Sequence, residues 1–119
     1  MAPTRVVGLT SGVTAIAAGM FHTCAVVDQG VRCWGYNFSG QLGNKSRISS
    51  PVPLPVEGLT HGVSAVAAGG HPNQTPSSGH SCALVGGTMR CWGSNYLGQL
   101  GSGVDRKDAL VPNPPITFE

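Results

Sequence analysis

Four cysteines are the residues of this chain best suited to covalent chemistry, and they form two pairs with the same spacing. The pairs are Cys24 with Cys33 and Cys82 with Cys91, with eight residues between the members of each. A turn signal, Asp28-Gln29-Gly30 or Gly86-Gly87, lies near the middle of each interval and predicts a hairpin, with Gly30 in the left-handed conformation. Counting back from these turns places the paired cysteines opposite one another, which predicts two cross-hairpin disulfides.

Two histidines keep a metal site open as an alternative. His22 and His80 lie two residues before Cys24 and Cys82, and a His-x-Cys step on a strand points both side chains to the same face. The second cysteine of each pair follows too late for the Cys-x-x-Cys spacing that indicates zinc. Buried free thiols are a third alternative. Disulfides are the leading interpretation, and the sequence predicts neither a metal ion nor any other cofactor.

The segments that must position these residues occur twice in the sequence. Arg32–Gly43 returns as Arg90–Gly101, identical at nine of twelve positions and offset by 58 residues. Gly8–Gly19 returns as Gly58–Gly69 with an offset of 50 residues. The difference between the two offsets places an eight-residue insertion within the polar segment 70–79. A period of 50 residues lies in the range of propeller blades and solenoid units.

Each repeat predicts four short strands, because apolar runs alternate with turns that contain glycine and proline. The runs are Val13–Ala18, His22–Val27, Val31–Tyr36 and Pro51–Glu57 in the first repeat, and Val63–Gly69, His80–Val85, Thr88–Gly93 and Val111–Phe118 in the second. Prolines in the fourth runs favour edge strands. We therefore expect an all-β fold, a partial β-propeller of two four-stranded antiparallel blades plus an extra N-terminal strand. Residues 1–11 are expected to be the tail strand of a preceding blade, 12–59 the first blade, and 60–119 the second blade with its insertion at 70–79.

Composition narrows the classes of partner. The chain has 119 residues with 18 glycines and 9 prolines, only 10% of its residues are charged, and its formal net charge is +2. So small a charge argues against binding to nucleic acid or to an anionic membrane. No apolar run approaches the roughly 18–20 residues needed to cross a bilayer. We therefore expect no nucleic-acid partner and no membrane insertion.

The pattern resembles the repeat of the regulator of chromosome condensation family. The resemblance is carried by the run Trp-Gly-x-Asn-x-x-Gly-Gln-Leu-Gly that begins at Trp34 and at Trp92, by Ala-Ala-Gly-x-x-His ending at His22, and by Pro-x-x-Val-x-Gly-Leu ending at Leu59. It implies propellers that typically have seven blades of four strands. It also implies varied functions: nucleotide exchange on the Ran GTPase, light sensing in plants, and β-lactamase inhibition by a secreted bacterial member. The paired cysteines resemble the extracytoplasmic bacterial branch, so we expect an extracellular or periplasmic location.

Four aromatic residues of the repeat are interpreted as blade-packing positions. They are His22, Trp34, His80 and Trp92. No partnered nucleophile lies in register with the histidines, and a glycine directly after each tryptophan favours packing between blades over stacking on a ligand. The Gly-Gln-Leu-Gly turns lack the strand-to-helix context of a phosphate-binding loop. We predict no catalytic residue and no enzymatic activity.

The loops that differ between the repeats are candidate binding segments, because binding residues often lie on loops of a repeated scaffold. The candidates are Lys45, Arg47, His71, Asn73, Gln74, Asp105, Arg106 and Lys107. Asn-x-Ser/Thr sequons occur at Asn37, Asn44 and Asn73. Asn37 lies in the core of the repeat and is interpreted as structural. The other two lie in loops and are plausible glycosylation sites only in a eukaryotic secretory host, so the default expectation is no modification.

Two repeats cannot close a propeller, which leads to the functional hypotheses. Bare blade faces and edge strands favour association, so the chain is expected to be part of a longer protein or to assemble with itself into a ring or a filament. The leading hypothesis is a non-enzymatic interaction or structural module that self-associates through its incomplete propeller edges. The alternatives are a partner-inhibiting or GTPase-exchange module, with segment 70–79 as the candidate exchange loop, and a fragment of a secreted propeller with lectin-like binding.

Overall fold

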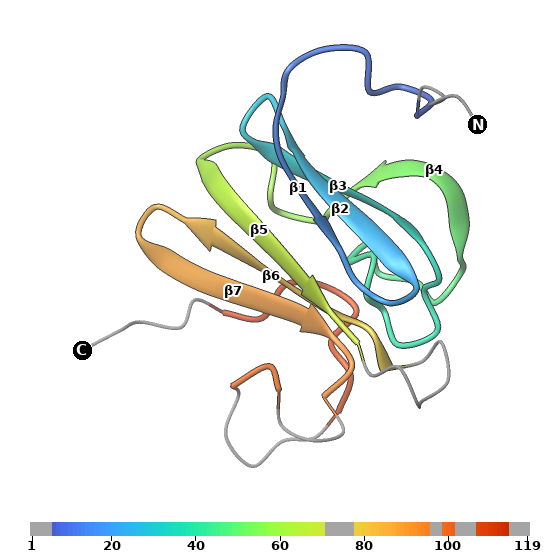
Figure 1. The fold of residues 1–119 in the computed structure, drawn as a ribbon. Helices are drawn as coiled ribbons and strands as arrows, with labels where there is room; N and C mark the ends of the chain where they lie inside the picture. Colours follow the sequence, from blue (N-terminus) through green and yellow to red (C-terminus); the bar gives the residue numbers. More distant parts are fainter. Residues whose placement is uncertain (1–5, 71–77, 96–98, 102–106, 115–119) are drawn as a thin grey trace.

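A computed structural model describes residues 6–70, 78–95, 99–101 and 107–114, which form two antiparallel sheets (Figure 1). The first sheet contains β1 (Val13–Ala18), β2 (His22–Val27), β3 (Gly30–Gly35) and β4 (Ser50–Pro55), in that order. The second contains β5 (Val63–Gly69), β6 (His80–Val85) and β7 (Thr88–Gly93). The all-β prediction of two blades is confirmed. The predicted insertion at 70–79 falls largely outside the described residues.

The hairpin between β2 and β3 has a two-residue turn, which corrects the predicted role of Gly30. Asp28 and Gln29 carry the positive φ angles, 50° and 68°, as a tight hairpin turn requires. Gly30 is already the first residue of β3. It is needed for another reason: a Cβ there would lie 3.0 Å from the carbonyl oxygens of both Leu59 and Thr60. Glycine therefore lets the linker between the blades pass close to the turn.

The fourth strand forms in the first blade and is reduced to isolated contacts in the second. In the described part of the predicted strand Val111–Phe118, the one backbone hydrogen bond to the neighbouring β7 runs from Asn113 N–H to Cys91 O, at 2.8 Å. A separate bridge joins Gly93 and Ala109. Between these contacts Leu110 turns toward the first blade, where its carbonyl accepts from Lys45 N–H at 3.0 Å. This turn interrupts the ladder, so the prediction of a fourth strand here was wrong for residues 111–114.

The predicted N-terminal strand is also absent from the described residues. Residues 6–12 form turns, with Leu9 N–H donating to Val6 O at 3.1 Å. The corresponding residues 56–62, which follow β4, form the same turns, and Leu59 N–H donates to Val56 O at 3.2 Å. The segment therefore corresponds to the turns that join β4 to β5 and not to a strand.

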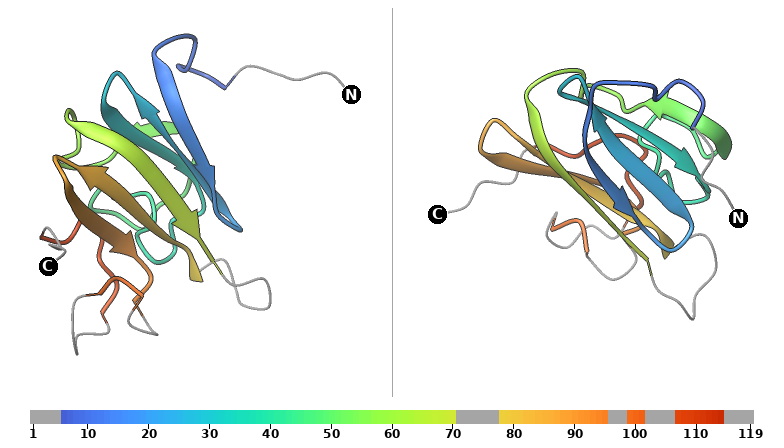
Figure 2. Two further views of the ribbon diagram at one scale, coloured as in Figure 1. Left: turned by 60° about the vertical axis from the view of Figure 1, so that its left-hand side comes forward. Right: turned by 45° about the horizontal axis from the view of Figure 1, so that its top comes forward.

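The core lies between the two sheets, which stand side by side in Figure 2. Strand β5 of the second blade contacts β1 and β2 of the first. The buried cluster consists of Cys24, Val26, Val31, Cys33, Leu42, Val56, Leu59, Val63, Ala83 and Trp92. Both blades contribute to it, so each blade is stabilised by burying its apolar side chains against the other. Nothing in the described ranges is a helix long and apolar enough to cross a membrane.

Candidate interaction surfaces

Both cysteine pairs are joined in the structure, Cys24 to Cys33 and Cys82 to Cys91. The members of each pair are direct partners in the hairpin register, and their Cα atoms are 4.1 Å apart. The sulfur atoms that a zinc site would need are engaged in these bonds. Among the residues described, no group of three or more His, Cys, Asp or Glu side chains could hold a metal ion.

Removing the disulfides is expected to destabilise the two blades unequally. Each bond closes a short loop, so its loss should lower the free energy of unfolding by about 2–3 kcal/mol. Cys24 and Cys33 are both fully buried, whereas Cys82 is partly exposed. The double variant Cys24→Ala/Cys33→Ala should therefore cost more than Cys82→Ala/Cys91→Ala, as measured by urea unfolding. Equal losses of stability in the two double variants would contradict this prediction.

A buried chain of hydrogen bonds crosses from one blade to the other. His22 Nε2 and Ser81 Oγ are 2.8 Å apart, and Ser81 Oγ donates to the backbone carbonyl of Gln41 at 3.0 Å. Trp92 Nε1 donates to the same carbonyl at 2.8 Å. Because the Ser81 hydroxyl has one proton and gives it to Gln41, the network assigns the proton between His22 and Ser81 to the Nε2 atom. His22 and Gln41 belong to the first blade, and Ser81 and Trp92 to the second.

His22 is held in its neutral form. Its pKa is lowered from 6.5 to about 4, chiefly by burial and secondly by the charge of His80. Burial also lowers the pKa of His80. The Nδ1 atom of His22 is buried and finds no hydrogen-bond partner among the described residues. A hydrogen bond to the His80 backbone acts in the opposite direction and raises the pKa of His22, but burial outweighs it.

The sequence did not predict the close approach of Ser81 to His22, and a serine beside a histidine is the arrangement of an activated nucleophile. A catalytic serine must be reachable by substrate, and its histidine is normally oriented through the other ring nitrogen. Ser81 has no exposed surface, and its proton is directed to Gln41 O. The Nδ1 atom of His22 has no orienting group in the described structure. The pair is therefore suited to joining blades rather than to attacking a substrate.

The two tryptophans occupy the same position of the repeat but differ in burial. Trp92 has no exposed surface, and a Cβ placed at Gly43 would lie only 2.8 Å from its Nε1 atom. Trp34 is half-buried. Trp92 has the first blade as a neighbour, whereas Trp34 lies on the side of the first blade that faces away from the second. The same motif therefore builds an interface at one position and presents a surface at the other.

The outer side of the first blade carries an uncovered apolar surface, which we call the Trp34 face. It consists of Val13, Ile16, Thr23 and Trp34, whose counterparts in the second blade are Val63, Val66, Ser81 and Trp92. Val13 is 42% exposed and Ile16 66%. Val63 is only 4% exposed, and Val66 packs against the core cluster. The counterparts are covered because they meet the first blade.

The outer side of the second blade carries the complementary surface, the His80 face. It consists of His80, Cys82 and Leu84, whose counterparts in the first blade are His22, Cys24 and Val26. Those counterparts are 3%, 0% and 0% exposed, whereas Leu84 is 39% exposed. Alternation along β6 explains this difference, because Ser81 and Ala83 point toward the first blade and Leu84 points away. The Trp34 and His80 faces are thus the two halves of an interface that the molecule already contains once.

The candidate loop residues are not gathered into one site. Arg47 pairs with Asp108 at 3.0 Å and Lys45 with Glu57 at 3.5 Å, so their charges connect the loop 44–50 to its surroundings. Lys107 is exposed. The remaining candidates lie outside the described residues: His71, Asn73, Gln74, Asp105 and Arg106. The structure thus places Arg47 in contact with Asp108 of the second blade. The predicted binding role of these loops stays a prediction.

Asn37 holds the turn that follows β3. It is fully buried, and its Nδ2 atom donates to Ser46 O at 2.9 Å and to Ile48 O at 3.1 Å. Its Oδ1 atom accepts from Leu42 N–H at 2.9 Å, and Asn95 repeats this bond to Leu100 at 3.1 Å. An amide engaged in this way cannot carry a glycan in the folded chain.

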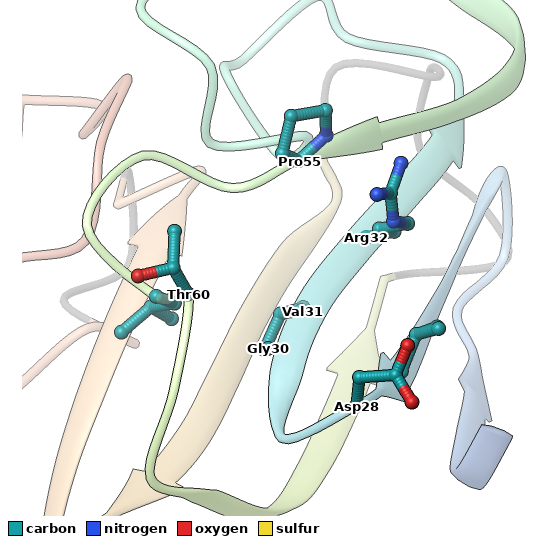
Figure 3. Close-up of a pocket in the computed structure, with 8 residues that line it drawn as sticks. Asp28, Gly30, Val31, Arg32, Pro55 and Thr60 are labelled. Atoms are coloured by element: carbon teal, nitrogen blue, oxygen red, sulfur yellow. The ribbon is translucent and has the colours of Figure 1, made fainter. Parts of the chain in front are cut away.

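A hollow of about 190 Å³ lies beside the β2–β3 turn (Figure 3). Its lining residues are Val27, Asp28, Gly30, Val31, Arg32, Pro55, Leu59 and Thr60. Figure 3 shows the Asp28 carboxylate and the Arg32 guanidinium at separate places on its rim. Neither a histidine nor a cysteine lines it.

The sequence contained a signal for one of the two interface residues that were missed, Gln41 and Ser81. The hydroxyl of Ser81 is kept in its counterpart Thr23, and a polar group kept at the same repeat position indicates a shared hydrogen bond. Gln41 accepts through its backbone carbonyl, which any residue type supplies. What the sequence could not show is that the bond lies between blades, because His22 and Ser81 are 59 residues apart.

Comparison with known sequences identifies the repeat. Two family profiles, both described as Regulator of chromosome condensation (RCC1) repeat, match residues 13–41 and 30–72. The Ultraviolet-B receptor UVR8 of Arabidopsis thaliana is 32% identical over 110 residues, which are 90% of this chain and 23% of the receptor. The chain therefore spans less than a quarter of the length of this curated relative.

Solved structures show the same architecture. Human WBSCR16 superposes with a TM-score of 0.75 at 24% identity, covering 97% of this chain and 28% of the human protein. Prp20p from Saccharomyces cerevisiae superposes with a TM-score of 0.73 at 23% identity, covering 99% and 27%. At these identities the likeness concerns the fold alone. With the matched profiles and the repeated blade interface, it shows that this chain belongs to the regulator of chromosome condensation (RCC1) repeat family and is built as blades of a β-propeller.

Proposed function

We propose that this chain is a non-enzymatic protein-interaction module that self-associates head to tail. The His80 face of one copy packs on the Trp34 face of the next. One observation carries the proposal: the valine at the start of the first strand of each repeat is 4% exposed where the two blades meet, as Val63, and 42% exposed on the outer face, as Val13. Each outer face matches one half of the internal interface, so a second copy supplies the missing half.

The polar contacts of the internal interface supply the expected contacts between copies. Thr23 and Trp34 occupy the positions of Ser81 and Trp92. In an assembly, His80 Nε2 would donate to Thr23 Oγ1 of the next copy, as His22 does to Ser81 within the chain. Thr23 and Trp34 would in turn donate to the backbone carbonyl of Gln99, as their counterparts do to Gln41. A buried network with all partners present favours one defined register.

Such contacts are heterologous, because two different faces meet. Assemblies of this type close into rings or continue as filaments, depending on whether the rotation per copy closes. Relatives support a role in protein binding in general, since Prp20p is described with its binding properties to Gsp1p and histones. The two disulfides support an extracellular or periplasmic location, where such bonds persist.

The expected result is a mass that rises with concentration. Sedimentation velocity and native mass spectrometry of the 119-residue chain should show oligomers that dissociate on dilution. Val13→Glu should raise the dissociation constant about 100-fold or more, because it places an unpaired carboxylate in the buried contact. Val52→Glu is the matched control, since Val52 is similarly exposed at 38% but lies on the outermost strand, β4. A well-folded wild-type chain that stays monomeric at every concentration would contradict the proposal.

A further inference from the structure

We propose that a groove beside β3 binds the Gly-Gln-Leu-Gly turn of a second copy, and so sets the register of the assembly. The groove has a volume of about 390 Å³ and is lined by Phe21, Gly35, Tyr36, Ser49, Ser50 and Pro51. Its occupant would be the turn that contains Gln99, Leu100 and Gly101. This inference rests on the proposed self-association and assigns a specific site to it.

The reason for the proposal is that the second blade already binds such a turn. We call this binding site the seat; it is formed by Gly79, Gly93, Ser94, Ala109 and Leu110. The turn of the first blade, closed by Gly43 N–H donating to Gly40 O at 2.9 Å, lies against Ala109 and Leu110. A Cβ built at Gly40 would lie 2.9 Å from Leu110 Cα and 3.0 Å from Ala109 O. A Cβ built at Gly93 would lie 3.2 Å from Gln41 Cα. The backbone of the turn therefore rests directly on the backbone of the second blade.

The groove has the same pattern of backbone hydrogen bonds and strand pairing as this seat. In the seat, Ser94 N–H donates to Gly79 O at 2.8 Å, and in the groove Tyr36 N–H donates to Phe21 O at 2.9 Å. Gly93 pairs with Ala109 in the seat. Correspondingly, Gly35 pairs with Ser50 in the groove. The groove residues thus correspond to the seat position by position, and the groove is the seat without its turn.

The backbone conformation of the bound turn shows what kind of peptide the groove can accommodate. Gly40 has a φ of 79° in the seated turn, a conformation that favours glycine, and the close contacts at its Cα leave no room for a side chain. The ligand is therefore a tight glycine-containing turn rather than an extended peptide. Gly98 occupies the position of Gly40 in the second repeat, so the second repeat has the required residue.

Aromatic side chains distinguish the groove from the seat. Phe21 and Tyr36 replace Gly79 and Ser94, and their rings meet edge to face with centroids 5.7 Å apart. Tyr36 is 42% exposed and is available to cover a bound turn. A Cβ at Gly79 would lie 2.8 Å from Gln41 Nε2 and 3.0 Å from His22 Nδ1, so Phe21 requires the corresponding side chains of the second copy, Gln99 and His80, to move aside. Both contacts are with side-chain atoms, so this movement leaves the backbone contacts in place.

The test uses a capped synthetic peptide with the sequence of residues 95–101 and the full chain carrying Leu84→Glu. This substitution blocks the His80 face, so no second copy of the variant competes for the groove. In an NMR titration of the ¹⁵N-labelled variant, the peptide should bind with a dissociation constant on the order of 1 mM. The shifted amides should centre on Gly35, Tyr36 and Ser50. The same peptide with Gly98→Ala should bind about tenfold more weakly or worse, and Tyr36→Ser in the protein should weaken binding about threefold.

The outcomes separate this inference from the proposed function. Binding of the peptide while the wild-type chain stays monomeric would support the groove and contradict self-association. No binding while the wild-type chain associates would overturn the groove and leave self-association standing. Equal binding of the two peptides would also overturn it, because the groove would then not select a glycine turn. Binding only after Phe21→Gly would show that Phe21 excludes the turn, which is again contrary to the proposal.

Discussion

Trp92→Ala should lower the free energy of unfolding by about 3–5 kcal/mol, the range for removing a large buried aromatic side chain. Trp92 is fully buried in the core between the blades, and its indole N–H bonds to Gln41 O at 2.8 Å. Trp34→Ala should cost only about 1–2 kcal/mol, because Trp34 is half-buried and less apolar surface is lost. The two values can be obtained from urea unfolding followed by far-UV circular dichroism at low protein concentration.

The comparison is informative because the two tryptophans lie in the same motif. Trp92→Phe serves as a further control: it keeps most of the packing and removes one hydrogen bond, for an expected cost of about 1–2 kcal/mol. Gln41 O would still accept from Ser81. Equal costs for Trp34→Ala and Trp92→Ala would mean that the blade interface does not determine their energetic difference, which would contradict the account of the two faces.

Acidification should destabilise the chain by about 3 kcal/mol through His22 alone. The folded chain lowers the pKa of His22 from 6.5 to about 4, so between these values the unfolded state binds the proton more readily. The contribution of His22 to the free energy of unfolding is fully present above pH 6.5. It falls as the pH drops toward 4 and changes no further below that. Burial is the main cause and the charge of His80 the second.

Urea unfolding at a series of pH values checks this prediction. His22→Gln is the control, because its amide can still donate to Ser81 but does not titrate. The variant should lose most of the pH dependence between pH 6.5 and 4, apart from the smaller contribution of His80, whose pKa is also lowered. A variant with the same pH profile as the wild type would show that His22 is not the responsible group.

Local structure followed closely from the sequence, because each hairpin is specified by residues near one another in the chain. The predicted strands Val13–Ala18 and His22–Val27 agree with β1 and β2. The predicted Val31–Tyr36 differs from β3 by one residue at each end, and β3 begins one residue earlier because Asp28 and Gln29 alone form the turn. Cysteines placed opposite one another by counting from the turns are indeed register partners.

The interface and the outer faces could not be predicted in the same way. Trp34 and Trp92 share a nearly identical local sequence, and their burial differs only because a blade lies beside one of them. The bond between His22 and Ser81 depends on the packing of β5 against β1 and β2, which no local pattern reports. The N-terminal strand was expected from its likeness to Pro55–Leu59, but β4 ends at Pro55, and residues 6–12 form the same turns as residues 56–62.

The central claim, that the Trp34 and His80 faces are complementary, can be tested by mixing two chains. Val13→Glu disables the Trp34 face and leaves the His80 face intact, whereas Leu84→Glu does the reverse. Each variant alone should be a folded monomer of 12.1 kDa in native mass spectrometry. The equimolar mixture should give a 1:1 heterodimer that grows no further, because only one pair of intact faces is present. A mixture in which both variants remain monomeric, under conditions where the wild-type chain associates, would contradict the claim.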